Sequence, residues 1–66
     1  MELCKKIGQK IRKARTVKKI SQEELAHNAG IDRFYLSEIE NGHKNLSVLI
    51  LEQIADALEM DIKELF

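Results

Sequence analysis

The sequence predicts a single all-α domain of five helices over residues 1–66. It contains no proline and only three glycines, the two residue types that most often interrupt helices. Apolar residues recur at spacings of three and four in several segments, which is the period of an amphipathic helix. A serine or an aspartate precedes each of the last four segments, where its side chain can cap a helix N-terminus. These patterns predict helices throughout and no strands.

The first predicted helix runs from about Glu2 to Lys18. One apolar stripe, with spacings of four, four and three, is expected to face the core and consists of Leu3, Ile7, Ile11 and Ala14. Basic residues cover the other faces of this helix.

The charge is unevenly distributed although the formal net charge is zero. Residues 1–19 hold eight Lys or Arg and one acid, whereas residues 20–66 hold three Lys or Arg and ten acids. This asymmetry indicates a contact near the N-terminus with nucleic acid or another acidic surface. The alternative is that a basic helix packs beside an acidic one within the chain.

The second predicted helix begins with the segment SQEE, which is a capping box. The Ser21 hydroxyl can accept from the backbone N–H of Glu24, whose carboxylate can reach back to the serine. The helix runs to about Asn28, and Gly30 ends it because glycine tolerates positive φ.

Asp32 caps the third predicted helix, which ends at Asn41 and Gly42. Two helices joined by a short turn that contains a glycine match the helix-turn-helix pattern. The sequence therefore predicts a helix-turn-helix unit at about residues 21–41.

Two further helices are predicted in the last third of the chain. Ser47 caps a helix of about Val48 to Leu58. Asp61, with Glu64 three residues later, can form a second capping box for a short helix ending at Phe66. The predicted core stripe of the fourth helix consists of Val48, Leu51, Ile54, Ala55 and Leu58.

A rotation of about 100° per residue divides the third helix into two faces. Leu36 and Ile39 define the core side, and Tyr35 lies at its border, so we expect this tyrosine to be partly packed with a free hydroxyl. The opposite face is expected to be exposed and carries Phe34, Ser37, Glu38 and Asn41, with Arg33 at its edge.

The residue types on this exposed face can read base edges in a DNA major groove. Arginine can donate to guanine O6 and N7, an apolar side chain can contact the thymine methyl, and glutamate can accept from cytosine N4. The alternative is an ordinary solvated face with one unburied phenylalanine. The capped helix before it, the glycine turn and the basic first helix favour DNA recognition.

Five segments resemble, in order and spacing, the DNA-binding domain of the Cro and lambda-type phage repressors, a family of five-helix helix-turn-helix proteins. The segments are IGQKIRKAR, ISQEELAHNAGID, YLSEIENG, KNLS and LEQIADAL…ELF, and the resemblance covers about residues 7–66. The segment DRFYLSEIENGHKNLS is most similar to the controller proteins of restriction–modification systems. Those proteins are small, lack a ligand domain and regulate transcription as dimers.

The resemblance implies roles for individual residues. Gln22 matches a glutamine that contacts a DNA phosphate and braces the recognition helix, and Arg15 and Glu40 match a structural pair that joins the first helix to the third. The base-reading positions fall on Arg33, Phe34, Ser37, Glu38 and Asn41. The positions that contact the DNA backbone fall on Ser21, Gln22, Lys44 and Asn45.

We expect a homodimer that forms through about residues 48–66. A second apolar stripe lies beside the core stripe of the fourth helix, and exposed apolar clusters mark interfaces. The predicted interface residues are Leu49, Ile50, Ile54, Ala57, Met60 and Phe66. A twofold dimer would place two recognition helices about 34 Å apart, which matches half-sites one DNA turn apart. The alternative is that these residues fill the core of one chain.

No catalytic, metal or cofactor site is predicted. His27, His43 and Cys4 have no ligand spacing, and no Ser/His/Asp set or carboxylate pair suggests an enzyme. The single cysteine rules out an internal disulfide, which fits a cytoplasmic setting. The chain begins without an apolar run of signal-peptide length, and its longest apolar run, VLIL, is too short to span a membrane.

The sequence therefore predicts a sequence-specific DNA-binding transcriptional regulator that acts as a homodimer on a palindromic operator in double-stranded DNA. We expect it to repress transcription, or to control a neighbouring gene by recruiting RNA polymerase, without a small-molecule ligand. One alternative is an antitoxin-like protein whose main partner is a toxin. Another is an interaction module without DNA binding, against which the set of Gln22, Arg33 and Lys44 argues.

Overall fold

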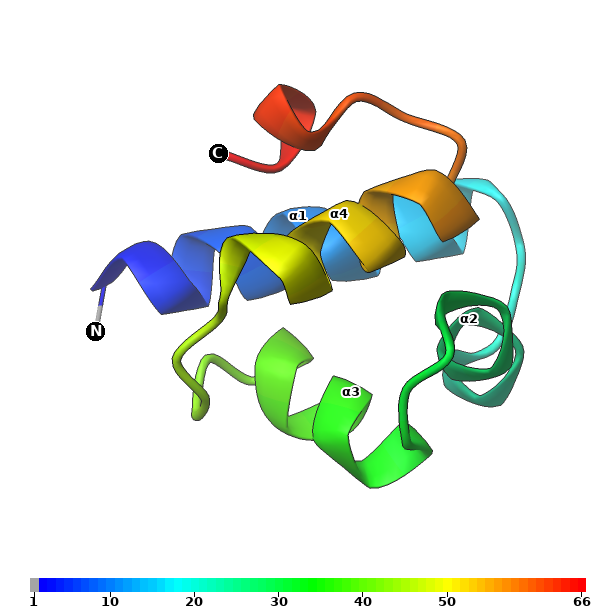
Figure 1. The fold of residues 1–66 in the computed structure, drawn as a ribbon, viewed down its shortest axis with the longest axis horizontal. Coiled ribbons are helices and arrows are strands. Elements are labelled where there is room, and N and C mark those ends of the chain that lie inside the picture. The colour runs from blue at the N-terminus through cyan, green and yellow to red at the C-terminus, as the bar shows by residue number, and fades with distance from the viewer. Residues whose placement is uncertain (1) are drawn as a thin grey trace.

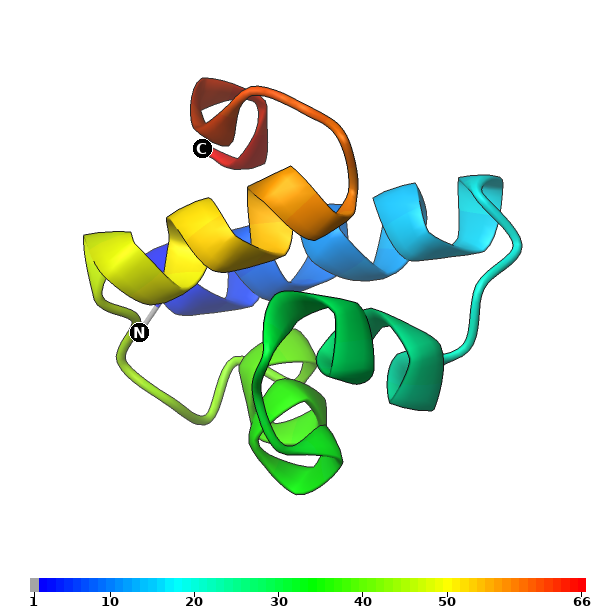
Figure 2. The same ribbon diagram turned by 45° about the vertical axis from the view of Figure 1, so that its right-hand side comes forward.

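The computed structural model describes residues 2–66, which form helices, turns and loops without a strand. The elements are α1 (Glu2–Val17), α2 (Gln22–Ala29), α3 (Arg33–Glu40), α4 (Val48–Ala57) and the 3₁₀ helix η1 (Ile62–Leu65). In both views α2 and α3 lie on one side of α1 and α4, and η1 lies on the other side (Figures 1 and 2). The all-helical prediction is confirmed. The predicted fifth helix is instead a 3₁₀ turn of four residues, because so short a segment cannot propagate regular α-helical hydrogen bonds.

Side-chain caps fix where the later helices begin. Ser47 caps α4 by accepting from a backbone N–H in the first turn, and Asp32 caps α3 in the same way. At η1 the predicted capping box is formed, because the Glu64 carboxylate accepts from the Asp61 N–H at 3.0 Å. Local polar signals in the sequence therefore place these helix starts.

The turn between α2 and α3 has the predicted glycine geometry. Gly30 adopts φ 72°, and its N–H reaches the carbonyls at the end of α2. At the other end of α2, Ser21 Oγ accepts from the Glu24 N–H at 3.0 Å. The second bond of a capping box, from the Ser21 backbone N–H to the Glu24 carboxylate, is not made among the described residues. The capping box predicted at Ser21 is therefore half formed.

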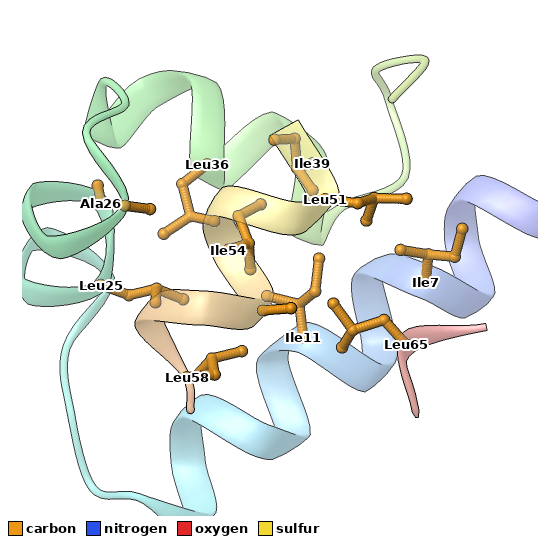
Figure 3. Packing of buried hydrophobic residues seen from close by; sticks show 12 residues of the cluster. Ile7, Ile11, Leu25, Ala26, Leu36, Ile39, Leu51, Ile54, Leu58 and Leu65 are labelled. Atoms are coloured by element: carbon orange, nitrogen blue, oxygen red, sulfur yellow. The ribbon is translucent and has the colours of Figure 1, made fainter. Parts of the chain in front are cut away.

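The core draws side chains from all five elements. Figure 3 shows Ile11, Ile54, Leu58 and Leu65 meeting between α1, α4 and η1. The buried cluster consists of Ile7, Ile11, Leu25, Ala26, Ala29, Leu36, Ile39, Leu51, Ile54, Ala55, Leu58 and Leu65. This single cluster holds α2 and α3 in a fixed orientation.

Two residues of the predicted core stripes are exposed. The relative exposure of Leu3 is 51% and that of Val48 is 65%. Both lie in the first turn of their helices, which extends beyond the edge of the core. In the first turn of α1 the buried residue is Cys4 instead. Its Sγ lies 3.8 Å from Asn45 Oδ1 in the loop after α3.

Candidate nucleic-acid interface

The structure places the predicted base-reading residues together on the outer side of α3. Phe34 is 71% exposed, although it is one of only three aromatic residues in the chain. Arg33, Glu38 and Asn41 are exposed beside it, and Ser37 is half-buried. On the opposite side Leu36 and Ile39 are buried, and Tyr35 is intermediate, as the helical rotation predicts.

Arg33 and Phe34 form a stacked pair at the front of α3. The Arg33 guanidinium carbon lies 5.2 Å from the centre of the Phe34 ring, which is the geometry of a cation–π contact. The pair therefore presents a cation and an apolar surface at the N-terminal end of the helix.

The outer face of α3 is hollowed next to the loop that follows the helix. A hollow of about 300 Å³ is lined by Phe34, Tyr35, Glu38 and Lys44. Outside this lining, His43 Nδ1 lies 3.1 Å from Glu38 Oε2. The carboxylate can only accept, so Nδ1 carries the proton in this contact. The loop thus supplies a cation to the hollow and a hydrogen-bond donor to its acid.

A buried carboxylate joins the three helices behind this face. Glu40, at the end of α3, is 3% exposed. Its Oε2 accepts from Arg15 Nε at 2.9 Å, and its Oε1 accepts from Arg15 Nη2 at 3.1 Å and from Gln22 Nε2 at 3.0 Å. Arg12 Nε lies 3.4 Å from the same Oε1. Side chains of α1 and α2 therefore fix the position of α3.

The electrostatics of Glu40 follow from these contacts. Burial raises the pKa of this carboxyl, but the hydrogen bonds from Arg15 and Gln22, the positive charge of Arg15 and the bond from Arg12 lower it more. The net result is a pKa below the usual value of 4.5. Glu40 is therefore ionised at neutral pH and compensates the guanidinium groups packed against it.

The predicted backbone-contact residues occupy two places. Ser21 and Gln22 lie at the N-terminal end of α2, where free backbone N–H groups favour an anion. Lys44 and Asn45 are exposed in the loop after α3. That loop and α2 lie on opposite sides of α3 (Figures 1 and 2), so the two places flank the exposed face of the helix.

Residues 11–65 match the helix-turn-helix family. The chain belongs to this family. It is 42% identical over 62 residues to the control protein C.MunI of Mycoplasma sp, an alignment that covers 92% of this chain and 84% of that protein. It is 42% identical over 59 residues to the control protein C.BamHI of Bacillus amyloliquefaciens, covering 88% and 73% of the two chains.

One solved structure agrees with this chain over the whole length. The restriction-modification controller protein C.AhdI from Aeromonas hydrophila superposes with a TM-score of 0.97 at 39% identity, covering 100% of both chains. The face described above lies on α3, the second of two helices joined by a turn that contains Gly30, which is the arrangement of the helix-turn-helix pattern.

Two residues that contact the exposed face of α3 were not predicted from the sequence. Arg12 Nη2 donates to Asn41 Oδ1 at 3.1 Å, so the carbonyl end of Asn41 is engaged and its amide remains a donor. His43 pairs with Glu38. In the sequence, only the basic excess of residues 1–19 indicated a role for Arg12, because the residues of α3 that it contacts lie far along the chain.

The predicted dimer surface is only partly exposed in this helix-turn-helix chain. Ile54 is 0% exposed, so its assignment to the interface is wrong: α4 turns it into the core with Leu51 and Leu58. Leu49 is 67% exposed. Of the other predicted residues, Phe66 is exposed, and Ile50, Ala57 and Met60 are partly buried against the core.

Two further observations concern other kinds of site. Within residues 2–66, no three His, Cys, Asp or Glu residues gather in a way that could hold a metal ion. None of the helices described here is long and apolar enough to cross a membrane.

Proposed function

We propose that this protein is a sequence-specific DNA-binding transcriptional regulator of the restriction–modification controller type. The observation that carries this proposal is the exposed face of α3, where Arg33, Phe34 and Glu38 stand free of the core. These side chains can address guanine, a base methyl group and cytosine, respectively. The three named relatives are control or controller proteins, which supports this assignment.

DNA would bind with α3 in the major groove. The N-terminal end of α2, with Ser21 and Gln22, would receive a phosphate on one side of the groove, and Lys44 would receive one on the other. Gln22 would link phosphate binding to the placement of α3, because its amide nitrogen donates to Glu40 at the end of that helix. These phosphate contacts would fix the register in which α3 reads the bases.

We further propose that the regulator acts as a homodimer on a palindromic operator. The exposed apolar side chains of Leu49 and Phe66 and the partly buried Ile50 support an interface on α4 and the C-terminal segment. A twofold dimer would place two copies of α3 about 34 Å apart on one side of the DNA. Cytoplasmic bacterial or phage DNA would carry the operator. Depending on where it lies, the dimer would block or recruit RNA polymerase.

Selection from random DNA duplexes tests the proposed function. The expected result is one enriched palindromic sequence, bound more tightly than unrelated DNA and with an affinity that falls as salt rises. Enrichment of no sequence, with equal binding to all duplexes, would show that α3 does not read bases.

A further inference from the structure

We propose that this protein reads a 5-methylated cytosine, with Phe34 contacting the methyl group and Glu38 accepting from the exocyclic amine of the same base. This inference rests on the proposed DNA-binding function and names the base chemistry that the site selects.

Phe34 and Glu38 face one shared space. They are four residues apart in α3, so they are neighbours on the same helical face. Both are exposed, and both line the hollow of about 300 Å³ that Tyr35 and Lys44 also line. An apolar ring and a hydrogen-bond acceptor therefore meet at one place on the outer face.

Each unmodified pyrimidine base can make a favourable contact with only one of the two residues, Phe34 or Glu38. Cytosine offers the N4 amine that a carboxylate accepts from, but it has no methyl group. Thymine offers a methyl group, but its O4 is an acceptor that faces the carboxylate unfavourably. In 5-methylcytosine the methyl group and the amine stand side by side on the major-groove edge, so one base satisfies both residues.

His43 positions the Glu38 carboxylate for this role. Its Nδ1 donates to Glu38 Oε2 at 3.1 Å, and a carboxylate has further lone pairs with which Oε1 can accept from a base. The Lys44 ammonium at the same hollow offsets the repulsion between the glutamate and nearby phosphates. The acid is therefore held as an acceptor in a place where an isolated glutamate would weaken DNA binding.

Arg33 extends the reading to a neighbouring base. Its guanidinium stacks 5.2 Å from the Phe34 ring centre, and arginine donates to guanine O6 and N7. The expected target is thus a base step in which a methylated cytosine adjoins a guanine.

The test uses two selections with the full chain, one from ordinary random duplexes and one from duplexes in which every cytosine is 5-methylcytosine. Both are expected to enrich a motif with cytosine at one shared position. In matched duplexes that differ only there, methylation should tighten binding about fourfold, the factor that corresponds to burying one methyl group. Thymine at this position should bind more weakly than either form of cytosine.

Three variants assign the effect to residues. Phe34→Ala should remove the methylation factor, and the exposure of this side chain, 71%, lets the variant fold. Val17→Ala, at an equally exposed apolar residue of α1, should keep the factor. Glu38→Gln should keep the methyl preference and lose the preference for cytosine over thymine. Circular dichroism confirms that each variant is helical.

The possible failures are distinguishable. An enriched motif whose binding is unchanged or weakened by methylation overturns the inference and leaves the proposed function standing. The inference is also overturned, with the proposed function still standing, if the methylation factor survives in Phe34→Ala. A preference for thymine over both cytosines has the same consequence. If neither pool yields an enriched motif, the proposed function fails and the inference fails with it.

Discussion

Arg15 donates from two guanidinium nitrogens to both carboxylate oxygens of Glu40, with Nε 2.9 Å from Oε2 and Nη2 3.1 Å from Oε1. A third nitrogen, Nη1, donates to the Ile20 carbonyl at 3.1 Å. One side chain of α1 thereby ties the end of α3 to the segment that leads into α2. A two-point contact of this kind fixes orientation as well as distance.

Glu40→Gln should destabilise the fold by about 3 kcal/mol, because it leaves Arg15, whose side chain is 17% exposed, without its compensating charge. The free energy of unfolding in urea measures this change. Glu59→Gln is the matched control: Glu59 pairs with Lys18 at 3.2 Å, but its side chain is 83% exposed, so the loss should stay below about 1 kcal/mol. Equal losses for the two variants would contradict the structural role of Glu40.

The contribution of Glu40 should depend on pH in the acid range. Its pKa is lowered in the folded state, so the folded protein binds this proton less readily than the unfolded chain does. The stabilisation is complete above the unfolded pKa, near 4.5, and is lost as the pH falls below that value toward the folded pKa. Urea unfolding at pH 7, 5 and 3 should show the gap between the natural chain and Glu40→Gln narrowing only at the lowest pH. A gap that is constant across this range would show that Glu40 titrates normally.

Local signals made the helix boundaries predictable. Ser21, Asp32, Ser47 and Asp61 cap the elements that follow them, and Gly30 ends α2 in the left-handed conformation, as the sequence indicates. These signals act over three or four residues, so they are readable without a tertiary structure. The periodicity of α3 likewise separated its core side from its exposed side.

Contacts between distant residues were harder to predict. Periodicity gives the angle of a side chain around its helix but not whether the core extends to that turn, so it placed Leu3 and Val48 inside although both are exposed. Ile54 fitted two overlapping stripes of α4, and only the packing against α2 and η1 decides between them. The pairing of Arg12 with Asn41 depends on how α1 crosses α3, which no local pattern encodes.

Gly8→Ala should destabilise the protein by about 3 kcal/mol, although alanine is the better helix former by about 1 kcal/mol. A Cβ at residue 8 would stand 2.7 Å from the Glu40 carbonyl oxygen and closer still to that of Ile39. Both obstacles are backbone atoms, so α3 itself would have to shift. Thermal or urea unfolding checks this, with Gln9→Ala at a neighbouring exposed position as the control, expected within about 0.5 kcal/mol. A Gly8→Ala variant as stable as the natural chain would mean that α1 and α3 are not in such close contact.

Leu49→Glu should weaken the proposed dimer by at least about tenfold, because a charge would be placed in an apolar interface. Leu49 is 67% exposed within one chain, so the substitution should leave the fold of each protomer intact. Sedimentation equilibrium measures the dissociation constant. Val17→Glu places the same charge at an exposed apolar residue of α1 and should leave it unchanged. If the natural chain sediments as a monomer at tens of micromolar, the dimer proposal is wrong.

Arg33→Ala and Lys44→Ala should weaken DNA binding in different ways. Arg33 is placed to read a base, so its loss should cost about 1–3 kcal/mol and relax the preference at one position of the selected site. Lys44, exposed in the loop after α3, is placed to contact a phosphate. Its loss should weaken binding to all sequences alike and reduce the slope of log affinity against log salt by about one unit.

Titrations of the selected duplex and of single-base variants, each at several salt concentrations, separate these two effects. Lys63→Ala is a suitable control, because this lysine is exposed on η1, on the side of α1 and α4 opposite to α2 and α3 (Figures 1 and 2). It should change neither the base preference nor the salt slope. If Arg33→Ala changed only the salt slope, or Lys44→Ala changed the base preference, the two roles would have to be exchanged. The DNA would then lie further toward the C-terminal end of α3 and the loop that follows it than the proposed roles imply.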